Sequence, residues 1–274
     1  MAEDAHRAAE ASARDGYGRL LARLARRARD IDTAEDALSD AFADAIRAWP
    51  RDGVPRNPEA WLLTAARWRL VDGSRREGAR QRVAEGAAAL LAHPEQPMSA
   101  DAPFADERLE MLLLCAHPAL ALVVRAPLML QVVLGFDPAA IASAFLVPPA
   151  TMGQRLVRAK ARIRDTGMRF GLPSGIELAE RLPFVLDAVL AAYGAAWEDA
   201  APGGGGGLGG EALALAEVAA EHLPGEAEAK GLLALILYCL ARRPARRSPE
   251  GDFVPVSEQD TTRWDAGMHR RAEG

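Results

Sequence analysis

The most informative side chains for chemistry lie in the basic stretch 151–164, where apolar and polar residues separate at helical spacing. The polar face carries Thr151, Gln154, Arg155, Arg158 and Arg162. In the DNA major groove, arginine can form two hydrogen bonds to guanine and glutamine can do the same with adenine. We therefore expect this face to bind duplex DNA, with Gln154, Arg155 and Arg158 best placed for the bases. An ordinary surface helix with solvated arginines is the alternative.

A second stretch, 59–76, interleaves tryptophan with arginine on an expected helix. Exposed aromatic rings stack on unpaired bases while guanidinium groups hold the phosphates, so this composition favours single-stranded DNA. Trp61 and Trp68 lie seven residues apart and share a face. For Trp61, a place in the hydrophobic core is preferred over stacking on DNA. For Trp68, the two interpretations are equally favoured. The candidate contacts, with the two residues before this helix, are Arg56, Asn57, Trp61, Arg67, Trp68, Arg69, Arg75 and Arg76.

A third set is acidic. Asp36, Asp40 and Asp44 recur at four-residue steps along an expected helix over 34–49, opposite an apolar stripe. Three carboxylates could suggest a metal cluster, but no histidine joins them. We interpret this face as a docking surface for another protein.

Enzymatic motifs are missing from the sequence. It has no HExxH, nucleophile elbow or Walker motif, and the glycine-rich run at 203–210 is not followed by a phosphate-binding GK[ST]. Cys115 and His117 could offer two metal ligands, but a metal site needs more, and a buried cysteine beside a helix-end histidine is the favoured alternative. We expect no catalytic residue, no metal and no cofactor.

The composition predicts the elements that must position these residues. The chain has 274 residues, half of them hydrophobic but only 5% aromatic, and it is rich in alanine, so we expect an all-α fold. Its net charge of −5 is unevenly spread, because 14–82 and 108–170 are basic while 83–107 and 171–230 are acidic. Two separate basic modules permit nucleic-acid binding despite the acidic total.

The pattern along the chain predicts three parts and a linker. Residues 1–82 form a helical domain broken by the proline-rich 50–58, and 83–107 form a flexible acidic linker. Residues 108–172 include a short helix at 137–147, capped by Asp137 with Ile141 and Phe145 inward, then a turn and the basic helix, as in a helix-turn-helix domain. Residues 173–274 form a helical extension similar to tetratricopeptide arrays, with a mobile linker at 203–210.

The expected environment is the cytoplasm. The longest apolar run, 232–241, is half of a membrane span, and no secretory leader opens the chain. Two cysteines in apolar stretches fit a reducing compartment. We expect no membrane partner.

Several strings together resemble one family. AEDALSDAFADAIRAWP, PEAWLLTAARWRLVDGSRR, DERLEMLLLCAHPAL and IASAFLVPPATMGQRLVRAKARIR are similar to regions two and four of the extracytoplasmic-function (ECF) sigma factors of bacterial RNA polymerase. The tail, including SEQDTTRWD, looks like the extension of one subgroup, here expected to be truncated. The resemblance implies a sigma factor, not an enzyme, whose partners are core RNA polymerase and promoter DNA.

The same resemblance assigns roles to the three sets of residues. It implies that Asp36, Asp40, Phe42 and Asp44 bind polymerase. The stretch 50–58 and the helix after it would capture the unpaired minus-ten strand, and the basic helix would bind the minus-thirty-five duplex. The extension would be a candidate site for a regulatory protein. Two other functions stay open: a helix-turn-helix regulator that acts without polymerase, and a helical protein-interaction scaffold.

Overall fold

The structure, a computed structural model, describes residues 2–85, 107–198 and 208–274. The chain divides into two compact units, Met1–Pro173 and Ser174–Gly274. Throughout the described ranges the regular elements are helices, and the β-structure found there is an isolated bridge between Arg247 and Phe253. The predicted all-α fold is confirmed.

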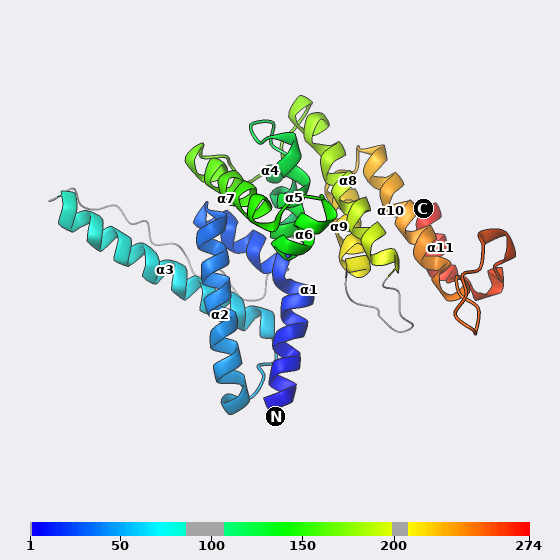
Figure 1. The fold of residues 1–274 in the computed structure, drawn as a ribbon, viewed down its shortest axis with the longest axis horizontal. Helices are drawn as coiled ribbons and strands as arrows, with labels where there is room; N and C mark the ends of the chain where they lie inside the picture. The colour runs from blue at the N-terminus through cyan, green and yellow to red at the C-terminus, as the bar shows by residue number, and fades with distance from the viewer. Residues whose placement is uncertain (1, 86–106, 199–207) are drawn as a thin grey trace. The chain divides into compact units, whose positions relative to one another are not determined.

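Three long helices open the first unit: α1 (Ala2–Ala28), α2 (Ile31–Asp52) and α3 (Pro58–Glu85), each in contact with the other two (Figure 1). Their shared core contains the fully buried Leu21, Leu38 and Leu62. Asp30 caps α2, because its side chain accepts a hydrogen bond from the Asp32 amide at 3.2 Å. The Asn57 side chain does the same for the Ala60 amide at 3.0 Å, where α3 begins.

Two expected boundaries in this region are wrong. Pro50 does not end its helix, since α2 continues to Asp52 and its backbone turns only at Gly53, with φ of 88°. A proline in the last turn removes one amide donor, and the buried Trp49 beside it anchors the turn. Residues 83–85 belong to α3 and not to the expected acidic linker, whose part at 86–106 lies outside the described residues.

The rest of the first unit is built from α4 (Arg108–Cys115), α5 (Leu122–Val132), α6 (Pro138–Ala144) and α7 (Pro149–Asp165). The predicted cap is confirmed: the Asp137 side chain accepts from the amides of Ala139 and Ala140. Ile141 is buried, as expected, and belongs to the core that α6 and α7 share.

Other expectations for this region need correction. The helix α6 ends at Ala144 and not at 147, and Pro149 starts α7 because a proline's fixed φ suits the first helical position. Phe145, expected to face inward, is 41% exposed, since it follows the end of the helix. Next to it, Leu146 takes a left-handed φ of 52°, which makes the turn into α7.

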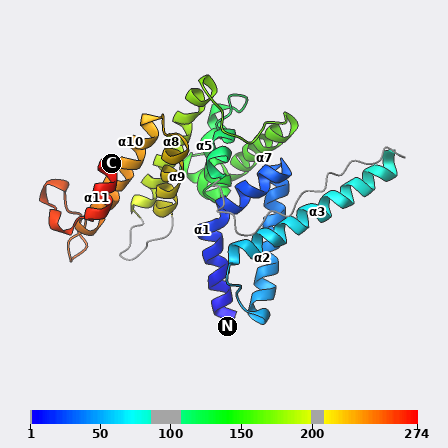
Figure 2. The same cartoon turned by 180° about the vertical axis from the view of Figure 1, so that it is seen from behind.

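The second unit contains α8 (Ile176–Glu198), α9 (Leu208–His222), α10 (Ala227–Ala241) and α11 (Ala266–Glu273), with short 3₁₀ turns Arg243–Ala245, Val256–Glu258 and Thr261–Arg263. Consecutive helices pack on one another (Figure 2). Residues 208–210 of the expected glycine linker are the first turn of α9, and 203–207 lie outside the described residues. Within the ranges that the structure describes, no helix is both long and apolar enough to span a bilayer.

Candidate nucleic-acid interface

The basic face of α7 forms as predicted. Its inner side buries Met152, Leu156, Ala159 and Ile163, which recur at three- and four-residue steps. On the outer side Gln154, Arg158 and Arg162 are exposed, whereas Thr151 and Arg155 are half-buried. The Nε of Arg158 donates to the Gln154 carbonyl at 3.2 Å, which holds the side chain along the helix. The remaining guanidinium donors of Arg158 are thus presented from a fixed position.

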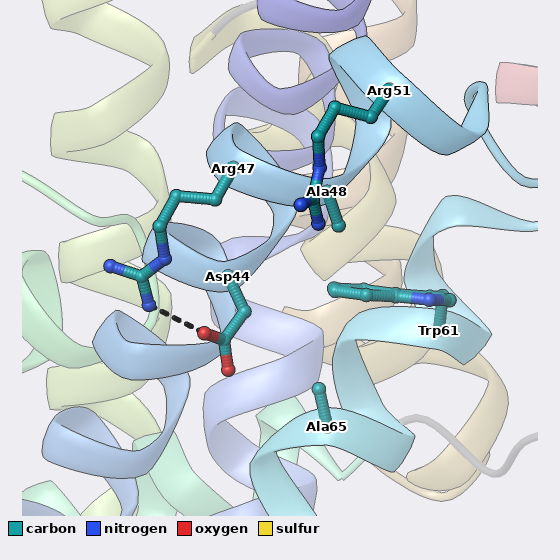
Figure 3. Close-up of a pocket in the computed structure, with 6 residues that line it drawn as sticks. All are labelled: Asp44, Arg47, Ala48, Arg51, Trp61 and Ala65. Carbon is teal, nitrogen blue, oxygen red and sulfur yellow. Dashed lines mark hydrogen bonds and ion pairs between the residues drawn. The ribbon is translucent and has the colours of Figure 1, made fainter.

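A pocket of about 580 Å³ lies between α2 and α3 (Figure 3). It is lined by Asp44, Arg47, Ala48, Arg51, Trp61 and Ala65. Both arginines extend from α2: Arg51 reaches toward the Trp61 ring of α3, and Arg47 turns toward Asp44. The arrangement combines two exposed cations with an aromatic wall, which is the chemistry that holds a base and its phosphate.

The Trp61 ring, which forms one wall of this pocket, is held in place by a buried tryptophan. Trp49 is 2% exposed, and its ring meets the ring of Trp61 edge-on, with centroids 5.6 Å apart and planes at 70°. Such edge-to-face pairs are favourable because the positive ring edge meets the negative ring face. Trp61 is therefore half-buried, in contact with the core on one side and with the pocket on the other.

Asp44 of α2 forms ion pairs with an arginine on its own helix and with one on α3. One carboxylate oxygen accepts from Arg47 at 2.5 Å and the other from Arg69 at 2.6 Å. These hydrogen bonds, first that of Arg69 and then that of Arg47, lower the pKa of Asp44 and keep it ionised. Its carboxylate is thus engaged within the chain, whereas Asp40 and Asp36, one and two turns earlier on α2, are exposed.

The tryptophan stripe continues past the pocket. Trp68 is 68% exposed, and positions 61, 65 and 68 follow one face of α3. A large aromatic ring exposed to this degree is uncommon and is available for stacking. Arg67 is half-buried, and burial, together with Arg23 and Arg27 nearby, lowers its pKa.

The remaining residues predicted to bind DNA or polymerase differ in exposure. Arg56 is exposed, and so is Asn57, whose side chain caps α3. Arg75 and Arg76 lie within α3, but their side chains are outside the described set. Phe42 is half-buried on α2. Arg47 and Arg51 were missed, although their position one and two turns after Asp44 is a signal that the sequence contains.

Cys115 and His117 lie in different surroundings, the first buried and the second half-buried. Cys115 is fully buried, which raises the pKa of its thiol, and His117 Nδ1 accepts from the Ala119 amide at 3.1 Å. Among the residues that the structure describes, no three His, Cys, Asp or Glu side chains gather as metal ligands would.

Comparison with known proteins identifies the two ends of the chain. Residues 14–80, which span α2 and most of α1 and α3, match sigma-70 region 2, and residues 181–274 match a family of unknown function, DUF6596. An uncharacterised protein of Rhizobium meliloti (strain 1021) is 34% identical over 253 residues, covering 89% of this chain. The chain spans 59% of that relative's length. No solved structure matches.

Proposed function

Because the chain carries a sigma-70 region 2 domain followed by a C-terminal DUF6596 domain, as a sigma-70 family factor with a C-terminal extension does, we propose that it binds core RNA polymerase and directs promoter recognition and opening. The observation that carries the proposal is the region 2 match over helices that hold an aromatic and basic pocket. The finer assignment, to the ECF group, rests on the strings quoted above, one of which spans α6 and α7.

We assign the unpaired minus-ten strand to α3 and its pocket. A displaced base would enter between Arg51 and Trp61, and the next base would stack on Trp68, about two turns along the same face. The arginines around the pocket would meet the phosphates. This use of both tryptophans explains why one is fixed by the core while the other stays exposed.

Trp68→Ala is expected to weaken binding of the complex with core polymerase to a single-stranded minus-ten oligonucleotide about tenfold, because one base loses its stacking partner. Fluorescence anisotropy with a labelled oligonucleotide measures this. Trp68→Phe, which keeps an aromatic ring, is the matched control and should retain most of the affinity. Equal loss with Phe and Ala would contradict stacking.

Polymerase docking is assigned to the exposed acidic side of α2, with Asp36 and Asp40 as its charges and Phe42 beside them. These carboxylates do not serve the core, since they lie opposite the buried Ala34, Leu38 and Ala41 stripe. An exposed charge row of this kind steers a partner of opposite charge and fixes its register. Asp44 is assigned the second role of ordering Arg47 and Arg69.

Asp40→Lys is therefore expected to reduce affinity for core polymerase about five- to tenfold while leaving the helical circular dichroism unchanged. Asp187→Lys makes the same charge change at an exposed site on α8 and serves as the control. Co-purification and titration of purified core enzyme measure both. Undiminished binding by Asp40→Lys would remove this face from the interface, and a chain that binds no core enzyme at all would favour a regulator that works through α7 alone.

A further inference from the structure

The pocket between α2 and α3 is open because two of its lining residues are alanines. Ala48 of α2 and Ala65 of α3 end at Cβ, so the space beside the Trp61 ring stays unfilled (Figure 3). Its volume of about 580 Å³ lies within the range of about 300–1,000 Å³ that small-molecule sites have. A nucleotide belongs to this class of ligand, and a leucine in place of either alanine would occupy part of the space.

Asp44 is the acidic residue among the six that line this pocket. Its side chain is 28% exposed, and in Figure 3 the carboxylate projects from α2 toward α3. Each carboxylate oxygen can accept about two hydrogen bonds. Arg47 uses one of these positions on Oδ1 and Arg69 uses one on Oδ2, so each oxygen keeps an acceptor position.

The same two arginines orient the carboxylate in advance. They hold it from both helices, since Arg47 lies on α2 and Arg69 on α3. The hydrogen bond from Arg69, followed by that from Arg47, lowers the pKa of Asp44. The carboxylate is therefore ionised, and an ionised carboxylate accepts hydrogen bonds without donating any. A base in this pocket must offer N–H groups to Asp44.

Guanine meets this requirement best among the four bases. Its Watson–Crick edge carries the N1–H and the N2 amino group side by side, and these can donate two parallel hydrogen bonds to one carboxylate. Adenine and cytosine each have one amino group beside an acceptor nitrogen, which would face the second carboxylate oxygen. Thymine has one N–H between two carbonyl oxygens. An acceptor that faces an acceptor away from water is unfavourable, so these three bases bind Asp44 less well.

Arg47 adds a donor beside these acceptors. Its Nη2 lies 2.5 Å from Oδ1 of Asp44, and its side chain is 67% exposed. The carbonyl oxygen O6 of guanine adjoins N1, so a guanine bound to Asp44 needs a donor next to the carboxylate. Arginine is the common partner of guanine O6 in protein–DNA complexes. Arg47 and Asp44 thus present a donor and two acceptors in the order that the guanine edge requires.

We propose that Asp44 determines which base the pocket accepts: it selects guanine through N1–H and the N2 amino group, with O6 on Arg47 and the ring against Trp61. The inference rests on the proposed function, in which an unpaired base enters this pocket. It deepens that function by naming the base and the side chain that selects it.

The test begins with a selection that requires no known promoter. The complex of the full chain with core polymerase is mixed with a pool of single strands randomised over the minus-ten stretch, and the bound strands are sequenced. Guanine should be enriched at one position.

Fluorescence anisotropy then compares labelled strands that carry dG, dA, dC, dT or deoxyinosine at that position. Deoxyinosine keeps O6 and N1–H but lacks the N2 amino group. It should bind about fivefold more weakly than dG, and dT about tenfold more weakly or worse, because each loses donors to the carboxylate.

Asp44→Asn should remove this selectivity. An amide keeps one acceptor and adds N–H donors, so dG, deoxyinosine and dT should bind within about twofold of one another, whatever the overall affinity. Asp187→Asn makes the same charge change at an exposed site on α8 and should keep the preference for dG. Circular dichroism of both variants checks that the helices are intact.

A second variant fills the pocket without changing a charge. Ala65→Leu should lower the affinity for the dG strand to that for the dT strand, because the base loses its place. Thr64→Leu adds the same side chain at an exposed position of α3 outside the pocket and should keep the preference for dG. Leucine is a good helix former, so both variants should fold.

Enrichment of another base, or a preference for dG that survives either Asp44→Asn or Ala65→Leu, would overturn the proposal. A wild-type complex that binds no single strand contradicts the proposed function as well. A complex that binds single strands through Trp68 but binds all four bases equally contradicts only the selection by Asp44.

Discussion

Replacing Trp49 by alanine is expected to lower the free energy of unfolding of the first unit by about 3–5 kcal/mol, the range for a large aromatic removed from a core. Trp49 is 2% exposed and supports Trp61 edge-on, so the cavity would also release the pocket wall. Urea unfolding of the full chain, followed by circular dichroism, measures the loss.

Two further variants test that interpretation. Trp68→Ala removes the same side chain from a site that is 68% exposed and should change the free energy of unfolding by no more than about 0.5 kcal/mol. Trp49→Phe keeps a ring and removes an indole N–H that has no hydrogen-bond partner among the described residues, so its cost should be below about 1.5 kcal/mol. Similar losses for Trp49→Ala and Trp68→Ala would show that Trp49 does not anchor this core.

Replacing Arg158 by alanine is expected to weaken binding of the polymerase complex to its minus-thirty-five duplex by about 1–3 kcal/mol, which is roughly 5- to 150-fold. Arg158 is exposed in the middle of α7, and its Nε bond to Gln154 leaves the terminal amino groups for a base edge. Titration with cognate and scrambled duplexes measures both the affinity and its sequence dependence.

The comparison between the two duplexes decides the role of Arg158. A loss confined to the cognate duplex supports a base contact. An equal loss on both, with the slope of log affinity against log salt reduced by about one, would make Arg158 a phosphate contact. Arg169→Ala should leave both affinities unchanged, and the same null result for Arg158→Ala would remove that residue from the interface.

Features that depend on neighbours within one or two turns were predictable from the sequence. The apolar repeat of Met152, Leu156, Ala159 and Ile163 predicted α7 with the correct buried face. Asp137 before Pro138 predicted the start of α6, because a cap needs only the amides two and three residues ahead. The polar face of α7 followed from the same periodicity. Caps and the 3.6-residue repeat depend only on residues that are close together in the sequence. The all-α fold was predictable for the same reason.

Other features were decided by contacts between distant segments. Periodicity placed Trp61 and Trp68 on one face and favoured the core only for Trp61, but the burial of that ring depends on Trp49, which lies behind it. In the sequence, Asp44 cannot be distinguished from Asp36 and Asp40. Only the structure shows that Arg69, 25 residues away, donates a hydrogen bond to its carboxylate. The pocket needs α2 and α3 together.

Lys160 shows the same limit most clearly. From the sequence, a lysine in a basic helix is expected to be exposed to solvent. Only the tertiary structure shows that its ammonium group donates a hydrogen bond to Glu35, 125 residues away. The sequence thus determined that the fold is helical and which face α7 would bury. The packing of those helices decided which polar side chains were left for DNA and which were paired within the chain, because a charged group's role depends on the opposite charge that the fold places beside it.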